Sequence, residues 1–187
     1  PLGKWIINEV CRQAKEWQDE GLPKIIAAIN LSAKQFAQKD IIKLVSNALK
    51  KSGLLPEFLE IEITETIIMQ NIDRTIKILN KFKEMGIQLS IDDFGTGYSS
   101  LSYLKQFPIN TLKIDKTFIK DLTKNRSDDT IANLVIDLGH TLGLNVIAEG
   151  VETVEQAEFL RKHACDKFQG YLVSRPVDKK EFRQILK

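Results

Sequence analysis

Short apolar runs alternate with amphipathic stretches along the whole chain. The amphipathic stretches carry apolar residues at helical spacing near residues 5–17, 40–52, 72–85, 99–106, 128–142, 154–163 and 178–186. The apolar runs have the length of buried strands and lie at residues 24–31, 59–64, 87–92, 111–115, 145–149 and 167–172. This alternation predicts an α/β domain whose parallel strands are covered by helices.

Capping patterns support the helix boundaries. Asp73 is placed to cap the helix near 72–85, and Gly53 stands where the helix near 40–52 should stop. Thr153 and Gln156 match the capping-box pattern at the start of the helix near 154–163. No linker or low-complexity segment interrupts the pattern, so residues 1–187 are expected to form a single domain.

Polar residues mark the end of every predicted strand. A doubly wound open sheet would place a glycine-rich turn after its first strand, but residues 30–33 read Asn-Leu-Ser-Ala. A (β/α)8 barrel instead builds its site from the carboxyl ends of many strands. Six polar strand ends therefore favour the barrel. In chain order they carry Asn30, Glu62, Asp92 with Asp93, Lys113 with Asp115, Glu149 and Gln169.

The run at 59–64 shows why these polar groups indicate a site. Its alternation places Leu59, Ile61 and Ile63 on one face and Glu60 and Glu62 on the other. A carboxylate that points into a covered sheet is costly to bury unless it is paired or bound to a cation. Any one such carboxylate could be a cap or an ion-pair partner, but polar groups at six successive strand ends weaken that explanation for the set.

The chemistry of the set suits a hard cation. Carboxylates and an amide oxygen, with no histidine or cysteine nearby, favour Mg²⁺ or Mn²⁺ over zinc. Asp92 and Asp93 cannot both face one way along a regular strand, but a turn at the strand terminus would let both reach neighbouring ions. Two divalent ions about 4 Å apart are the usual arrangement for in-line attack on a phosphodiester. Lys113 would add a fixed positive charge where an oxygen develops negative charge.

Composition narrows the class of protein. The 187 residues contain 27 Lys+Arg and 25 Asp+Glu, a net charge of +2, and no basic block, so no polymeric nucleic acid is expected as a partner. No apolar run approaches the ~20 residues of a membrane span. Two cysteines cannot make a disulfide framework, which favours a reducing cytoplasmic compartment. Trp5 and Trp17 are expected to belong to the core.

Several motifs together resemble those of EAL domains, which are bacterial cyclic-di-GMP phosphodiesterases with a modified (β/α)8 barrel. The motifs occur in the family's order, and one of them is nine residues long. They are Asn-Leu-Ser at 30–32, Glu-Ile-Thr-Glu at 62–65, Asp-Asp-Phe-Gly-Thr-Gly-Tyr-Ser-Ser at 92–100, Lys-Ile-Asp at 113–115, Ala-Glu-Gly-Val-Glu at 148–152 and Gln-Gly-Tyr at 169–171.

The resemblance implies a role for each matching residue. Lys113 resembles the lysine that holds the catalytic water, and Glu149 resembles a carboxylate that acts as metal ligand or general base. The residues that bind the substrate in the family correspond to Asn30, Asp115, Glu152 and Gln169. Two ions, Mg²⁺ or Mn²⁺, would be held by Asn30, Glu62, Asp92, Asp93 and Glu149. Glu65 resembles the anchor of a loop that couples dimerisation to activity, formed by Phe94, Gly95, Thr96, Gly97, Tyr98, Ser99 and Ser100.

The chain departs from the family in one respect. The Glu-Ala-Leu motif, whose glutamate is a metal ligand in the family, does not occur in it. Six strands and 187 residues also fall short of the eight strands and ~250 residues of a typical barrel. We therefore expect an N-terminally truncated barrel that covers the last three-quarters of an EAL domain and hydrolyses cyclic di-GMP to linear pGpG weakly.

Partners follow from the resemblance. They are cyclic di-GMP, a second copy of the chain in a homo-oligomer, and an upstream sensor or GGDEF-type domain in the parent protein; no membrane contact by this segment is expected. Two other functions remain open. One is a non-catalytic cyclic-di-GMP-sensing or protein-interaction module. The other is a barrel that abstracts a proton beside a carboxylate with a lysine base, which the motif at 92–98 disfavours.

Overall fold

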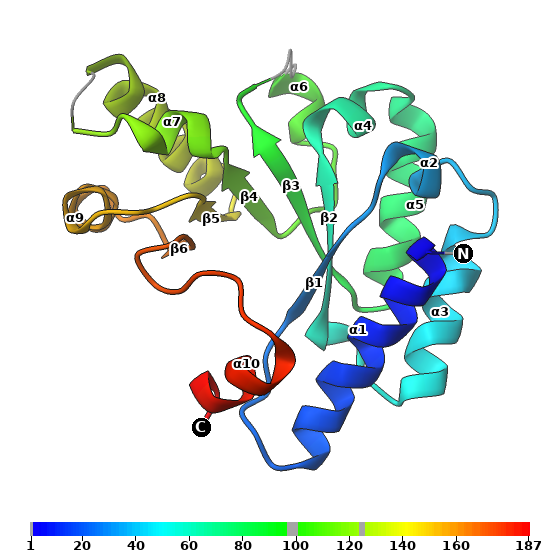
Figure 1. Ribbon diagram of the computed structural model, residues 1–187. Coiled ribbons are helices and arrows are strands. Elements are labelled where there is room, and N and C mark those ends of the chain that lie inside the picture. Colours follow the sequence, from blue (N-terminus) through cyan, green and yellow to red (C-terminus); the bar gives the residue numbers. More distant parts are fainter. Residues whose placement is uncertain (1, 97–100, 124–125) are drawn as a thin grey trace.

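The computed structural model describes residues 2–96, 101–123 and 126–187, which form a curved sheet with helices packed against it (Figure 1). Every pair of neighbouring strands is parallel, and their order in the sheet follows the chain. Six successive parallel strands give the expected α/β fold, a partial (β/α)8-type barrel. The strands are β1 (Ala27–Asn30), β2 (Leu59–Thr64), β3 (Gln88–Phe94), β4 (Thr111–Ile114), β5 (Asn145–Ala148) and β6 (Lys167–Phe168).

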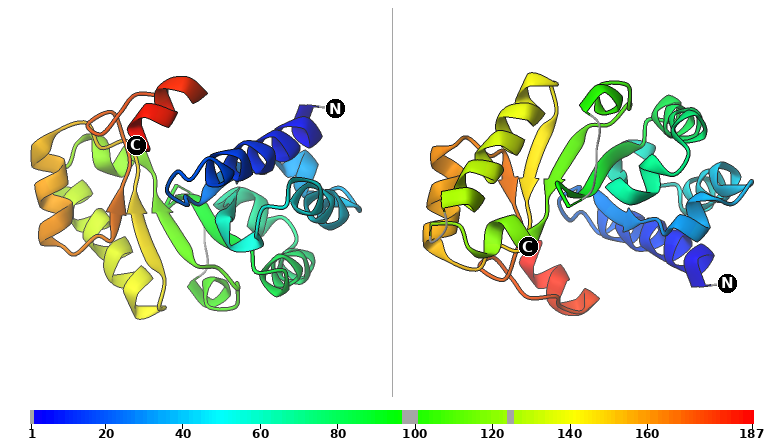
Figure 2. Two further views of the ribbon diagram at one scale, coloured as in Figure 1. Left: turned by 90° about the horizontal axis from the view of Figure 1, so that it is seen from below. Right: turned by 90° about the horizontal axis from the view of Figure 1, so that it is seen from above.

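Helices connect the strands and lie around the curved sheet when the molecule is seen along the strands (Figure 2). The long helices occur close to where the periodicity predicts them, but four short helical segments (α2, η1, α4 and α7) were not predicted. The helical segments are α1 (Leu2–Asp19), α2 (Ala33–Phe36), α3 (Ile41–Ser52), η1 (Pro56–Phe58), α4 (Glu65–Met69), α5 (Ile72–Glu84), α6 (Leu101–Leu104), α7 (Lys116–Lys120), α8 (Arg126–Thr141), α9 (Val154–Lys162) and α10 (Lys179–Ile185).

Two of the predicted boundaries are confirmed and two are wrong. Gly53 ends α3 with φ +73°, and α9 begins with the Thr153–Gln156 capping box. The cap of α5 is Asn71 instead of Asp73, because the Asn71 side chain accepts the Arg74 N–H. The last strand ends at Phe168 instead of residue 172, since the Leu172 N–H turns back to donate to the Val151 carbonyl.

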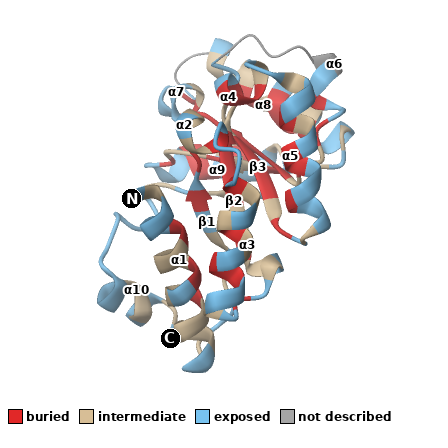
Figure 3. Ribbon diagram, turned by 90° about the vertical axis from the view of Figure 1, so that its right-hand side faces the viewer, coloured by how far each residue is buried: buried red, intermediate tan, exposed pale blue. Residues whose placement is uncertain are grey.

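The core lies between the sheet and the helices (Figure 3). The predicted face of β2 is buried there: Leu59, Ile61 and Ile63 are at most 1% exposed. Helix α1 buries Ile7, Cys11 and Ala14, which recur at helical spacing. The placement of Trp5 in the core was wrong, because two residues correspond to about 200° around a helix and turn Trp5 away from Ile7; its exposed fraction is 61%.

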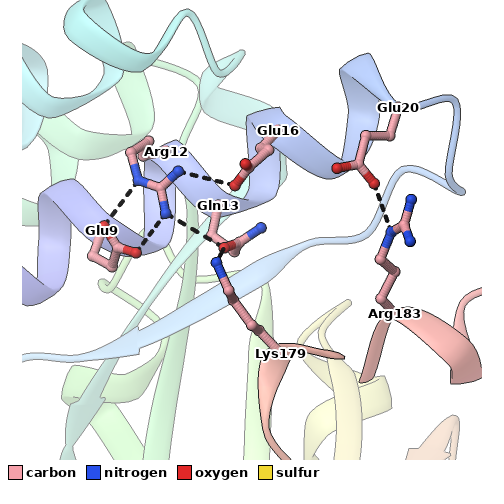
Figure 4. A network of polar contacts seen from close by, with 7 residues as sticks. All are labelled: Glu9, Arg12, Gln13, Glu16, Glu20, Lys179 and Arg183. Atoms are coloured by element: carbon pink, nitrogen blue, oxygen red, sulfur yellow. Dashed lines mark hydrogen bonds and ion pairs between the residues drawn. The ribbon is translucent and has the colours of Figure 1, made fainter. Parts of the chain in front are cut away.

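The C-terminal helix α10 returns to α1 (Figures 1 and 4). Arg183 donates to Glu20 at 2.7 Å, Lys179 donates to Gln13 at 3.5 Å, and the Trp17 and Phe182 rings lie 5.3 Å apart. Segments near the two ends of the chain are therefore side by side. Among the residues described, no helix is long and apolar enough to cross a bilayer.

Candidate functional site

A buried lysine joins four strands at their carboxyl ends. Lys113 is on β4 and is 3% exposed. Its Nζ lies 2.7 Å from Glu62 Oε1 on β2, 3.2 Å from Asp92 Oδ1 on β3, and 2.6 Å from Glu149 Oε1, one residue after β5. A side chain on one strand reaches this many partners only when the sheet curves around it. The curvature thus brings together Glu62, Asp92, Lys113 and Glu149.

A bulge at the end of β3 turns two adjacent aspartates toward the same place. The register with β4 shifts between Ile91 and Phe94, and Asp93 adopts a left-handed conformation with φ +54°. One carboxylate oxygen each from Asp92, Asp93 and Glu149 lies within 4.8 Å of the others. The two aspartates thus reach one site through a bulge within β3, which continues to Phe94, and not through the expected turn at the strand terminus.

Asp115 lies beside this group. Its Oδ1 accepts the Thr117 N–H at 2.8 Å, so it caps α7, and it shares a hydrogen bond with Asp93. Burial and this hydrogen bond raise the pKa of Asp93. Burial also acts to raise the pKa of Asp115, but the Thr117 hydroxyl and N–H outweigh it and lower that pKa. Asp93 is therefore the weaker acid of the two.

Burial and charge act in opposite directions around Lys113. Burial raises the pKa of Glu62 and of Glu149, and the hydrogen bond from Lys113 counteracts that rise in part. Burial alone would lower the pKa of Lys113, but hydrogen bonds to Glu149 and Glu62 raise it well above its usual range. Lys113 is therefore an ammonium ion at neutral pH in the metal-free protein.

Two amide side chains flank the carboxylates. Asn30 Nδ2 donates to Glu62 Oε2 at 2.9 Å from the end of β1, and Gln169 Nε2 donates to Glu149 Oε1 at 2.6 Å. Glu149, Glu152 and Gln169 also line a cavity of about 770 Å³, together with Tyr171. Glu152 is exposed and lies at the rim of the group, three residues beyond Glu149.

Hydrogen bonds hold the first residues of the loop after Asp93 in place. Glu65, which is 3% exposed, accepts the Gly95 N–H at 3.0 Å through Oε2. Phe94 is buried, and the Thr96 hydroxyl donates to the Asp93 carbonyl at 2.8 Å. Gly97, Tyr98, Ser99 and Ser100 of the predicted loop lie outside the described residues.

The donor set fits a hard divalent cation. Asp92, Asp93 and Glu149 offer three carboxylates that converge without a histidine or cysteine among the described residues. Glu62 shares the Lys113 ammonium group with Asp92 and Glu149, and the Asn30 amide donates to Glu62. Lys113 neutralises part of this charge. Of the residues around the site, sequence reasoning missed Gln156. Its capping-box pattern was recognised, but its contacts with α7 come from a segment 36 to 37 residues away.

Comparisons with known proteins agree with this geometry. A family model for the EAL domain matches residues 1–176. Signaling protein YkoW of Bacillus subtilis is 48% identical over 185 residues, which are 99% of this chain and 23% of that protein. The bifunctional diguanylate cyclase/cyclic di-GMP phosphodiesterase MucR of Pseudomonas aeruginosa is 45% identical over 176 residues, which are 94% of this chain and 26% of that protein.

Solved structures show the same fold. PaMucR phosphodiesterase in complex with c-di-GMP superimposes with a TM-score of 0.94 at 44% identity, over 97% of this chain and 73% of that one. A manganese and cyclic di-GMP complex of Klebsiella pneumoniae BlrP1 gives a TM-score of 0.80 at 32% identity, over 92% of this chain and 45% of that one. The chain spans about a quarter of the length of the first curated relatives that it matches.

Proposed function

Because the chain belongs to the EAL domain family, we propose that it is the metal-dependent catalytic segment of a phosphodiesterase that hydrolyses cyclic di-GMP to linear pGpG. The observation that carries this proposal is the convergence of Asp92, Asp93 and Glu149 beside the Lys113 ammonium group. An anionic pocket of this kind suits divalent ions, which in turn attract a phosphodiester. The relatives named as cyclic-di-GMP phosphodiesterases support the choice of substrate.

Two Mg²⁺ or Mn²⁺ ions would be held by Asn30, Glu62, Asp92, Asp93 and Glu149. When bound, they would polarise the phosphodiester and make a water molecule a stronger nucleophile. The manganese and cyclic di-GMP complex of BlrP1 supports this choice of ions.

The chain's own residues divide the remaining work. Lys113 orients the attacking water through its Nζ and stabilises negative charge that develops on oxygen. Glu149 ligates an ion or accepts the proton of that water, a role that its raised pKa suits. Asn30, Asp115, Glu152 and Gln169 contact the substrate, and Glu65 holds the loop that begins at Phe94.

The first prediction tests this proposal. We expect the chain to hydrolyse cyclic di-GMP at least ~100-fold more slowly than an EAL domain that contains the Glu-Ala-Leu motif, because one metal ligand fewer removes several kcal/mol of transition-state stabilisation. Chromatography of the nucleotides after incubation with Mn²⁺ measures the rate, and Asp93→Asn is the inactive control. Turnover equal to that of the complete domain would disprove the impairment. Binding of cyclic di-GMP with no pGpG at any enzyme concentration would favour a sensing module.

A further inference from the structure

A buried amide connects two loops of the site. Gln156 is in the first turn of α9 and is 5% exposed. Its Oε1 accepts the N–H groups of Glu152 at 2.8 Å and Thr153 at 3.1 Å. Its Nε2 donates to the carbonyls of Ile119 at 2.9 Å and Lys120 at 3.2 Å. A carboxamide has two donor hydrogens and two acceptor lone pairs, and all four are used here.

Helix capping explains only half of these contacts. The bond to the Thr153 N–H completes the capping box of α9, and the bond to the Glu152 N–H satisfies the donor just before it. The bonds to Ile119 and Lys120 satisfy carbonyls at the end of α7, which follows a different strand. A cap needs no contact with α7, and most caps are solvent-exposed. The second pair of bonds therefore has another effect, which is to fix the two segments relative to each other.

Both segments carry residues of the site. Asp115 lies two residues after Lys113 and caps the start of α7. Gln156 donates to the carbonyls at the end of this same helix. Glu149 is the first residue of the loop after β5, and Gln156 accepts the N–H groups of the last residues of that loop. The Glu149 N–H donates to the Ile114 carbonyl at 3.1 Å. The same loop also approaches the start of α7, since a Cβ added at Gly150 would lie 2.7 Å from the Lys116 Cβ. The loop therefore lies along α7, with contacts near both ends of that helix.

We propose that Gln156 is a positioning residue that sets the Glu149–Glu152 segment against α7 and so keeps the Glu149 carboxylate at the Lys113 ammonium and the two aspartates. Gln156 acts through the backbone and through Glu149. Its importance for the metal rests on the proposed function, whereas its effect on the contact between Lys113 and Glu149 does not.

The test compares Gln156→Leu, which removes all four bonds at similar volume, with Asn110→Leu as matched control. Asn110 is also an amide that accepts a buried backbone N–H, that of Leu89 at 3.1 Å, but at the opposite end of the sheet. Gln156→Glu retains the acceptor bonds and loses the donors, and it replaces Gln156→Leu if that variant does not fold. For each protein the Mn²⁺ dissociation constant and the NMR resonance of the Lys113 ammonium group without metal are measured.

We expect Gln156→Leu to weaken Mn²⁺ binding by about 10-fold, the lower end of what is lost with a direct partner of a metal ligand, and to shift the Lys113 resonance. Asn110→Leu should leave both unchanged even where it lowers the melting temperature equally. Unchanged Mn²⁺ affinity and an unchanged Lys113 resonance in the Gln156 variants would overturn the proposal. If the unsubstituted chain itself fails to bind Mn²⁺, the proposed function is wrong, and the Lys113 resonance still decides the role of Gln156.

Discussion

Lys113 is surrounded by more negative charge than one ammonium group can neutralise. It contacts Glu62, Asp92 and Glu149 directly, and Asp93 and Asp115 lie next to these groups. Carboxylates this close repel one another, and Asp92 contributes to the raised pKa of both Glu62 and Glu149. The metal-free protein therefore stores repulsion at this site, which bound divalent ions would relieve.

The second prediction follows for Asp92→Asn. Because the substitution removes one charge of a repelling group, the melting temperature in EDTA should stay the same or rise slightly, while hydrolysis of cyclic di-GMP should be lost. Lys113→Met is the opposite case: it leaves the carboxylates without a buried counter-ion and should cost about 3–5 kcal/mol of unfolding free energy. Calorimetry of both variants measures the contrast. A large fall in the metal-free melting temperature of Asp92→Asn would mean that Asp92 has a structural role.

The third prediction concerns acid stability at the other end of the barrel. Asp166 accepts the Val146 N–H at 2.8 Å and lies 2.9 Å from His140 Nε2. Although burial acts to raise the pKa of Asp166, these partners lower it on balance. A carboxylate whose pKa is lower in the folded protein stabilises it above the unfolded pKa, ~3.9, and this contribution is lost as pH falls through the folded pKa.

Asp166→Asn should therefore be less stable than the unsubstituted chain at pH 7, and the difference should be smaller at an acidic pH below the unfolded pKa of the carboxyl group. The side chains are about one-third exposed, so we expect a difference within about 1 kcal/mol. Urea unfolding at both pH values measures it. A difference that grows on acidification would contradict the lowered pKa.

At the scale of elements, the turns before and after β5 depend on glycines. Gly150 has φ +70°, and a Cβ there would lie 2.7 Å from the Lys116 Cβ. Gly143 also has φ +70°, but nothing lies within 4 Å of its Cβ position. The two glycines share the left-handed conformation and differ in the space around them.

The fourth prediction uses that pair. Gly143→Ala should cost about 1 kcal/mol, the strain of a left-handed residue with a side chain. Gly150→Ala adds the overlap with α7, so it should cost clearly more and should also weaken Mn²⁺ binding, because it displaces the segment of Glu149. Chemical denaturation and a Mn²⁺ titration separate the two effects. Equal costs for both substitutions would show that the loop moves away from α7 freely.

Local patterns predicted the elements better than the contacts between them. The alternation at 59–64 places Leu59, Ile61 and Ile63 in the core, and strand ends predict the gathering of Glu62, Asp92, Lys113 and Glu149. Neither pattern predicts the hydrogen bonds of Gln156 to α7, because that contact depends on how two segments far apart in the sequence pack. The same limit explains why the end of the last strand was mispredicted. That end depends on the hydrogen bond to the Val151 backbone and not on the apolar residues of the strand itself.

At the scale of the whole molecule, the sheet has two free edges. In the described chain β1 pairs only with β2 and β6 only with β5, so the curved sheet is open between them. Helix α10 reaches across to α1 but leaves apolar side chains uncovered. Ile26 is 47% exposed before β1, and Val173 is 68% exposed after β6. Free strand edges and apolar patches of this kind promote association.

The fifth prediction is that the chain associates with a second copy, as a dimer or larger, at micromolar concentration. Light scattering behind size exclusion measures the mass. Ile26→Lys should shift the chain toward a monomer, because a charge beside β1 opposes edge-to-edge pairing. Leu134→Lys is the matched control, since Leu134 is 60% exposed on α8 and lies away from the open edges. A stable monomer of the unsubstituted chain would show instead that the six strands and α10 suffice to cover the core, and association through the free edges would then be ruled out.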